Sequence, residues 1–152
     1  MEFSLPSVQD NPLTLRSVTE QLETRVPSKR TKILYIEDNI ANLKLIVDLV
    51  NKASGFDLCT AMQGGIGIER LETYEPDVVL VDLHLSDMSG LDVIENIRSN
   101  PKTAGIKVIV LSAEVDPKHL ELAIRTGADF IHSKPIDLKV LLSLLHDIAE
   151  AA

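Results

Sequence analysis

The sequence has few aromatic residues and only one cysteine. Aromatic side chains make up 3% of the 152 residues, and Trp is absent. Because many proteins stack exposed bases on aromatic rings, this composition argues against nucleic acid as a ligand. Cys59 has no second cysteine to pair with, which excludes an internal disulfide and a multi-cysteine metal site and is typical of a reducing compartment. We expect Cys59 to be a small, buried residue on a strand.

Long apolar runs are also missing. No run approaches the roughly 18 residues that span a bilayer, and the N-terminus lacks the basic and then apolar order of a signal peptide. We therefore expect a cytoplasmic protein without membrane insertion. The formal net charge of -8 repels phosphate backbones, so we also expect no nucleic-acid partner, whereas a metal ion would be attracted.

Residues 1–30 differ in composition from the rest of the chain. They contain three prolines, and their four acidic residues balance four basic ones, so the net charge lies in the remainder. Apolar residues between Leu15 and Val26 approximate a helical stripe. We expect residues 1–30 to be an N-terminal linker or a short helix. Residues 31–150 are expected to form one domain, since a typical domain holds on the order of 100 to 150 residues.

Short apolar runs alternate with segments of helical periodicity along the domain. The predicted strands are Lys32–Ile36, Phe56–Thr60, Asp77–Val81, Lys107–Leu111 and Asp129–His132. The predicted helices lie at 43–50, Gly64–Tyr74, Leu91–Arg98, Pro117–Thr126 and 141–148. This alternation predicts an α/β fold, a doubly wound five-stranded parallel sheet with helices on both faces. In such a sheet the functional site lies at the carboxyl ends of the strands.

Polar residues stand at these carboxyl ends. Glu37 and Asp38 follow the first strand, Asp82 the third, Ser112 the fourth and Lys134 the fifth. Carboxylates brought together repel one another unless they are protonated or share a cation, and oxygen ligands suit Mg²⁺. A carboxylate is also a competent nucleophile toward phosphorus, whose transfer mainly needs positioning and positive charge. The pattern therefore indicates a phosphoryl-transfer site.

Four stretches resemble the response-regulator receiver domains of two-component systems. They are ILYIEDN at 33–39, DVVLVDL at 77–83, VLSA at 110–113 and Lys134-Pro135. The resemblance covers about residues 32–148 and implies a flavodoxin-like sheet with strand order 2-1-3-4-5. The run EDNIAN at 37–42 is similar to receivers of hybrid sensor histidine kinases, so the chain could be a piece of such a kinase.

The resemblance assigns the chemical roles. It implies that Asp82 is the phosphoacceptor and that Lys134 pairs with Asp82 and its phosphate. The cofactor would be Mg²⁺ (or Mn²⁺), held by Asp38 directly, by Glu37 through water, by Asp82 and by the backbone carbonyl of His84.

The resemblance also implies a switch. The Ser112 hydroxyl would turn toward the phosphate, and the bond before Pro135 is commonly cis in the family. The switch and tuning positions are Ser112, Ala113, Glu114, Ile131 and Pro135, and the His84 side chain matches a position that tunes phosphorylation rates. Ile131 stands where many receivers have Tyr or Phe, which indicates an altered switch. Phe130 is one residue off and points to the opposite face of its strand.

Partners follow from the same resemblance. A histidine kinase or a histidine phosphotransfer domain would supply the phosphoryl group. An effector protein or a second copy would bind the face formed by the helix at Pro117–Thr126, the strand at Asp129–His132 and the last helix. The chain would be no enzyme, apart from Mg²⁺-dependent self-phosphorylation and autodephosphorylation.

Three alternatives stay open, and a degenerate receiver that acts as a phosphorylation-independent binding module is the first of them. A flavodoxin-like cofactor protein is disfavoured because the first loop carries Glu37-Asp38 rather than groups that bind a phosphate. An aspartyl-phosphate phosphatase is disfavoured because His84 stands where a second acid would act.

Other polar residues are expected to be structural. The four histidines, which are His84, His119, His132 and His146, show no metal-ligand spacing in the sequence, so we expect no zinc site. Asp87 and Gly90 are expected to shape the loop after the third strand through local hydrogen bonds and positive φ, and Asn39 to cap the following helix.

Overall fold

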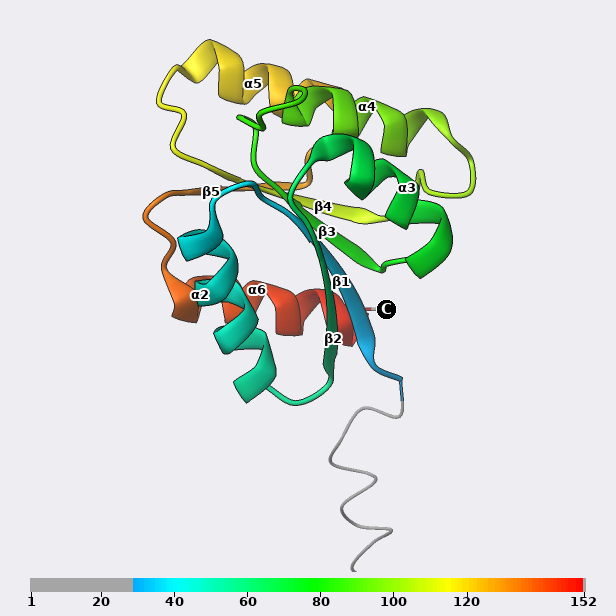
Figure 1. The fold of residues 1–152 in the computed structure, drawn as a ribbon, viewed down its shortest axis with the longest axis vertical. Coiled ribbons are helices and arrows are strands. Elements are labelled where there is room, and N and C mark those ends of the chain that lie inside the picture. Colours follow the sequence, from blue (N-terminus) through cyan, green and yellow to red (C-terminus); the bar gives the residue numbers. More distant parts are fainter. Residues whose placement is uncertain (1–28, 152) are drawn as a thin grey trace, which may run out of the picture. The chain divides into compact units, whose positions relative to one another are not determined.

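The computed structural model describes residues 29–151 (Figure 1). The strands of this part are β1 (Thr31–Ile36), β2 (Phe56–Ala61), β3 (Val78–Val81), β4 (Lys107–Ser112) and β5 (Phe130–Ser133). The helices are α2 (Ile40–Lys52), α3 (Gly64–Tyr74), α4 (Gly90–Ser99), α5 (Pro117–Thr126) and α6 (Leu138–Ala151). The linker or short helix expected at 1–30 lies almost entirely outside the described residues and stays a prediction, as does the domain boundary.

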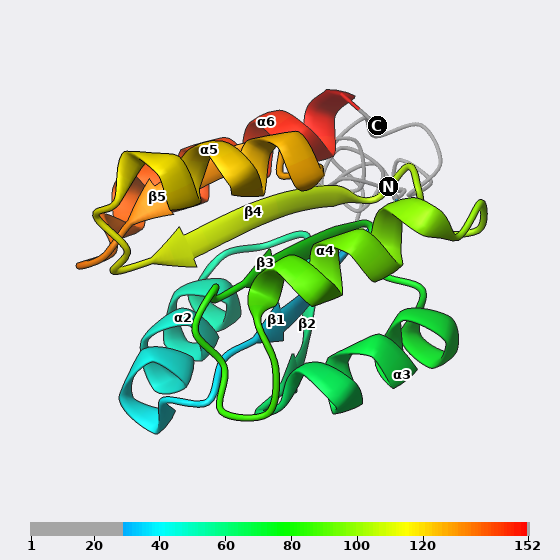
Figure 2. The ribbon, with the colours of Figure 1, turned by 90° about the horizontal axis from the view of Figure 1, so that it is seen from above.

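The strands form one parallel sheet in the order β2-β1-β3-β4-β5. Helices α2 and α6 cover one face of this sheet, and α3, α4 and α5 cover the other (Figures 1 and 2). The predicted fold class and strand order are therefore confirmed. The register pairs Ile36 with Val81 and Val81 with Val110, so the carboxyl ends of the central strands meet at one edge.

The central strands are apolar without a break because both faces of the sheet are covered. Successive side chains point to opposite faces, and the buried residues divide accordingly into two clusters. Leu34 and Ile36 belong to the cluster under α3, α4 and α5, whereas Ile33 and Tyr35 belong to the cluster under α2 and α6. Each fully buried aliphatic side chain stabilises the domain by roughly 1.5 to 3 kcal/mol.

Short sequence signals set the helix ends. The Asn39 side chain accepts a hydrogen bond from the Asn42 backbone at 3.0 Å, so the predicted cap of α2 is confirmed. Asp116 caps α5 in the same way, just before Pro117, and Gly127 ends that helix with a φ of 135°. Within the described residues, the helices are too short or too polar to cross a membrane.

Candidate functional site

The predicted residues converge at the carboxyl edge of the sheet. Glu37 and Asp38 follow β1 and Asp82 follows β3, and one carboxylate oxygen from each lies within 4.8 Å of the others. Lys134 follows the edge strand β5, and its side chain reaches the carboxylates of Glu37 and Asp82. Ser112 is the last residue of β4. The prediction that these side chains share one edge is confirmed, while their roles in phosphoryl transfer stay predictions.

Lys134 bridges two of the acids. Its Nζ donates to Glu37 Oε1 at 2.6 Å and to Asp82 Oδ2 at 2.9 Å. The side chains are nearly enclosed, with 14% of Lys134, 9% of Asp82 and none of Glu37 exposed. Burial lowers the pKa of Lys134, but its hydrogen bonds to the two carboxylates outweigh burial and raise the pKa. The ammonium is therefore a fixed positive charge beside Asp82.

Two further side chains, which the sequence did not reveal, donate hydrogen bonds to Glu37. The Tyr35 hydroxyl donates to Glu37 Oε1 at 3.1 Å, and the Asn42 amide donates to the same oxygen at 3.2 Å. Burial raises the pKa of Glu37, the hydrogen bond from Lys134 lowers it, and repulsion from Asp82 raises it again, with a net upward shift. Burial, followed by the charge of Glu37, raises the pKa of Tyr35, which keeps this hydroxyl a donor.

Asp82 is held by the loop that follows β3. The backbone N–H of His84 donates to Asp82 Oδ1 at 3.1 Å, while Oδ2 accepts from Lys134. Gly90 packs against this loop so closely that a Cβ atom there would lie 2.3 Å from the Asp82 carbonyl oxygen. Among the glycines of the described residues, those with a positive φ are Gly55 and Gly127, and Gly90 is not one of them. The expected positive φ at Gly90 is therefore wrong, and close approach is the reason for this glycine.

The three carboxylates fit a divalent cation. Hard oxygen ligands that leave room for water suit Mg²⁺, and such an ion would relieve the repulsion among them. Asp38 is half-buried, whereas Glu37 Oε1 already accepts three hydrogen bonds. Asp38 is thus the better placed of the pair for direct contact with an ion, and the carbonyl of His84 stays a predicted ligand.

Comparison with known proteins identifies the family. The family model named Response regulator receiver domain matches residues 33–146. The chain belongs to the response regulator receiver domain family. These domains are parts of two-component signalling systems, are generally non-enzymatic, and bind Mg²⁺ at an acidic pocket.

Two regulators and one solved structure illustrate the similarity. The cell cycle transcriptional regulator CtrA of Caulobacter vibrioides is 32% identical over 117 residues, which cover 77% of this chain and 49% of CtrA. The DNA-binding response regulator MtrA of Mycobacterium tuberculosis is 31% identical over 114 residues, 75% of this chain and 48% of MtrA. The signal receiver domain of the DNA binding response regulator merR from Colwellia psychrerythraea 34H superposes with a TM-score of 0.75 and 26% identity, covering 79% of this chain and 98% of that one. The chain thus spans about half the length of these curated relatives.

In this receiver domain, Ser112 ends β4, which is the neighbour of β3 in the sheet, and Asp82 directly follows β3. The Ser112 side chain is buried, and Oγ accepts a hydrogen bond from the Glu114 backbone at 3.0 Å. Its carbonyl accepts from the Lys134 backbone at 2.9 Å, which ties the ends of β4 and β5 together. Ser112 Oγ thus links the end of β4 to the loop that begins at Ala113, which is exposed.

The remaining switch positions lie on or beside β5. Ile131 packs against the core cluster under α3, α4 and α5, whereas Phe130 is exposed. Phe130 does not take the inward place of Ile131, which agrees with the expected alternation. The bond between Lys134 and Pro135 is cis, as the resemblance implied.

Asp87 holds the loop after β3 against a helix far away in sequence. Its two carboxylate oxygens accept from the backbone N–H groups of Gly64 at 2.9 Å and Gly65 at 3.0 Å, where α3 begins. The bond from Gly65, followed by that from Gly64, lowers the pKa of Asp87. The expected loop-shaping role is confirmed, but it includes long-range bonds as well as local ones.

The Asp87→Ala variant is expected to unfold at a lower urea concentration than the parent at neutral pH. A carboxyl whose pKa is depressed by folding stabilises the protein above its unfolded-state pKa, and this stability is lost as the pH falls through the folded-state value. The difference between parent and variant should therefore shrink below about pH 4. The exposed Asp48 on α2 offers a control, Asp48→Ala, and an equal effect of both substitutions would contradict the assignment.

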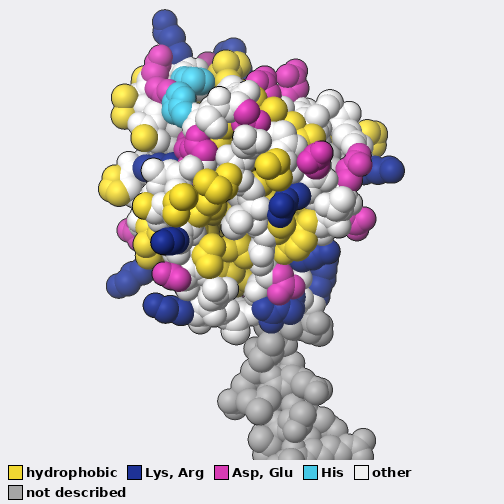
Figure 3. Space-filling view, viewed as in Figure 1, with side chains coloured by type: hydrophobic (Ala, Val, Ile, Leu, Met, Phe, Trp, Pro, Cys, Tyr) yellow, Lys and Arg dark blue, Asp and Glu magenta, His cyan; other side chains and the backbone are white. Residues whose placement is uncertain are grey.

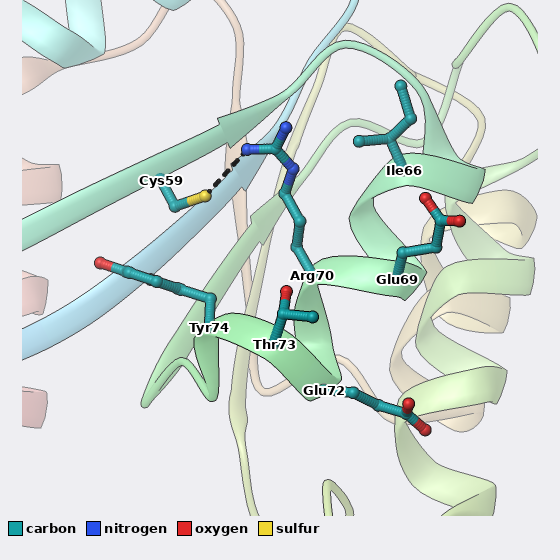
Figure 4. A pocket seen from close by; sticks show the side chains of 7 residues that line it. All are labelled: Cys59, Ile66, Glu69, Arg70, Glu72, Thr73 and Tyr74. Atoms are coloured by element: carbon teal, nitrogen blue, oxygen red, sulfur yellow. Dashed lines mark hydrogen bonds between the residues drawn. The ribbon is translucent and has the colours of Figure 1, made fainter.

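Cys59 is less buried than expected. It lies on β2 as predicted, but β2 is an edge strand, so the side chain is only half-buried and accepts a hydrogen bond from Arg70 at 3.2 Å. Figure 4 shows this pair among the residues that line a hollow, which also include Glu69, Thr73 and Tyr74. The volume of this hollow is about 660 Å³. The hollow is formed by β2 and α3 and includes none of the residues predicted to act in phosphoryl transfer.

Proposed function

We propose that this receiver domain accepts a phosphoryl group on Asp82 from a phosphohistidine of a histidine kinase or histidine phosphotransfer domain. The observation that supports this most is the placement of the Asp82 carboxylate, with Lys134 Nζ at 2.9 Å and the acids of Glu37 and Asp38 close by. A nucleophile, a cation and a set of oxygen ligands for Mg²⁺ are the parts that phosphoryl transfer requires.

Each residue of the site has a separate role in the phosphoryl transfer. A bond forms between an Asp82 oxygen and phosphorus as the phosphorus–nitrogen bond of the phosphohistidine breaks, and the imidazole leaves. Lys134 neutralises charge on the phosphoryl oxygens, and Mg²⁺, when bound, would supply further positive charge there. Glu37 and Asp38 would hold this ion, and Tyr35 and Asn42 fix the carboxylate of Glu37. Water later cleaves the acyl phosphate, which releases inorganic phosphate and regenerates the Asp82 carboxylate.

The phosphoryl group would change a surface as well as Asp82. Ser112 Oγ would leave the Glu114 backbone N–H and donate to a phosphoryl oxygen, which moves the loop before α5. The surface next to this loop carries exposed apolar side chains, which are Val115, Leu122, Ile124 and Phe130. These support the α5, β5 and α6 face as the site for an effector protein or a second copy.

The proposal predicts Mg²⁺-dependent phosphorylation by a small donor. Phosphoramidate, which carries the same phosphorus–nitrogen bond as phosphohistidine, should add one phosphoryl group to the folded chain in Mg²⁺, as measured by intact-protein mass spectrometry. EDTA should abolish the gain, because the carboxylates then repel the donor.

A matched pair of variants locates the ion. Asp38→Asn should slow the reaction at least about 100-fold, since a metal ligand is lost, whereas Asp48→Asn on the exposed side of α2 should react like the parent. Equal rates for Asp38→Asn and the parent, or phosphorylation that persists in EDTA, would overturn the proposed metal-assisted step.

A further inference from the structure

Two histidines converge on one carboxylate oxygen at the surface near the phosphoacceptor loop. His84 Nε2 lies 2.9 Å from Glu114 Oε2, and His119 Nδ1 lies 3.0 Å from the same atom. The residues come from the loop after β3, the loop after β4 and the first turn of α5. Figure 3 shows histidine atoms gathered beside acidic atoms in the region where Figure 1 places the start of α5. No sequence spacing reveals this cluster, because 30 residues separate His84 from Glu114.

The carboxylate of Glu114 is fixed by a separate bond. Its Oε1 accepts from the Asp116 backbone at 3.0 Å, so Oε2 is left to face both imidazole rings. The bond from Asp116, followed by that from His84, lowers the pKa of Glu114, which keeps the carboxylate charged. The rings of His84 and His119 meet edge to face, with centroids 5.7 Å apart. The three ligand atoms are thus preorganised.

The spacing suits a tetrahedral metal. Two ligand atoms that are each about 2.1 Å from a tetrahedral ion lie roughly 3.4 Å apart, which is only a few tenths of an ångström more than the nitrogen–oxygen distances observed here. Two imidazoles and one carboxylate, with a water in the fourth position, are a ligand set that proteins use for Zn²⁺. Imidazole ligands favour Zn²⁺ over Mg²⁺, whereas the all-oxygen acidic site favours Mg²⁺.

We propose that His84, Glu114 and His119 form a Zn²⁺ site distinct from the acidic site around Asp82. The ion would take the place of the hydrogens on His84 Nε2 and His119 Nδ1, and the ring proton of each neutral histidine would move to its other nitrogen. The expectation from the sequence that the histidines form no zinc site is revised accordingly. The site also joins the loops after β3 and β4, so bound Zn²⁺ would hold them together.

The test measures Zn²⁺ binding to the chain made without a histidine tag. Saturating Mg²⁺ occupies the acidic site while Zn²⁺ is titrated by calorimetry and the bound metal is counted after equilibrium dialysis. The parent is expected to bind one Zn²⁺ per chain. His119→Gln and Glu114→Gln should each weaken binding by at least roughly 100-fold, because loss of even an outer-shell partner costs 10- to 100-fold. Circular dichroism confirms that each variant is folded.

Two control variants separate the site from its alternatives. His146→Gln removes an exposed histidine from α6 and should bind Zn²⁺ like the parent, and Asp38→Asn should also retain this ion. Co²⁺ in place of Zn²⁺ should give the visible absorption of four-coordinate cobalt in the parent and lose it in His119→Gln. Binding that survives in His119→Gln, or that is lost only in Asp38→Asn, would show that the histidines merely bridge the loops by hydrogen bonds. Neither result decides whether Asp82 accepts a phosphoryl group, which the phosphoramidate reaction tests separately.

Discussion

Replacing Lys134 by methionine is expected to lower the free energy of unfolding by about 3 kcal/mol at neutral pH without Mg²⁺. The methionine keeps an apolar stem of similar length but leaves the buried carboxylate of Glu37 and the nearly buried one of Asp82 without their cation. Breaking a buried ion pair on one side is costly because the remaining charges lose compensation. Urea unfolding of parent and variant measures the difference.

The pH dependence of this defect has a defined sign. Without Lys134 the pKa of Glu37, already raised by burial, should rise further, and a carboxyl with a raised folded-state pKa costs stability above that value. The defect should therefore shrink as the pH falls toward the unfolded-state pKa of Glu37, and Mg²⁺ should reduce it at neutral pH. Lys139→Met on the exposed side of α6 is the matched control. A pH-independent defect, or equal defects in the two variants, would contradict the electrostatic account.

The Gly90→Ala variant is expected to lose about 3 kcal/mol of stability and most of its phosphoryl uptake. The added methyl group would lie 2.3 Å from the Asp82 carbonyl oxygen and 2.8 Å from the Leu83 Cα. Both neighbours are backbone atoms, so relief requires the loop that carries Asp82 to move. A shift of about 1 Å at a reacting group is enough to cost on the order of 100-fold in rate.

Gly105 provides the control for this substitution. A Cβ atom at Gly105 would meet nothing within 4 Å, and its φ lies outside the left-handed range. Gly105→Ala should therefore leave phosphoryl uptake unchanged and shift stability by less than about 1 kcal/mol, in the stabilising direction if at all. Urea unfolding and the phosphoramidate reaction compare the two variants, and a Gly90→Ala protein as stable as Gly105→Ala would refute the close-approach argument.

The sequence predicted the sheet well because burial on both faces leaves a clear apolar signal. The expected strand at Lys32–Ile36 differs from β1 by one residue, and α3 and α5 have the expected bounds. The last helix was predicted from apolar spacing at 141–148, but it begins at Leu138. The difference arises because the Asp137 side chain accepts from the Lys139 and Val140 backbones and so supports a first turn that precedes the apolar stripe.

The acidic part of the site could be predicted because parallel topology brings the strand ends together whatever the loops do. The contacts that depend on the geometry of the loops could not be predicted. Tyr35 reads as an ordinary strand residue, and the bond from its hydroxyl to Glu37 depends on how the chain continues beyond the end of β1. The meeting of His84 and His119 at Glu114 requires two loops to fold toward each other, which no periodicity encodes. The requirement for Gly90 likewise comes from packing between neighbouring backbones.

The phosphoacceptor role of Asp82 can be tested by locating the phosphoryl group on the chain. After reaction with phosphoramidate and Mg²⁺, borohydride converts an aspartyl phosphate to homoserine, which tandem mass spectrometry of peptides assigns to one residue. We expect homoserine at position 82 in the parent and no phosphoryl gain in a folded Asp82→Asn variant. A phosphoryl group at another residue, or none in a folded parent, would contradict the account, and the second result would favour a phosphorylation-independent binding module.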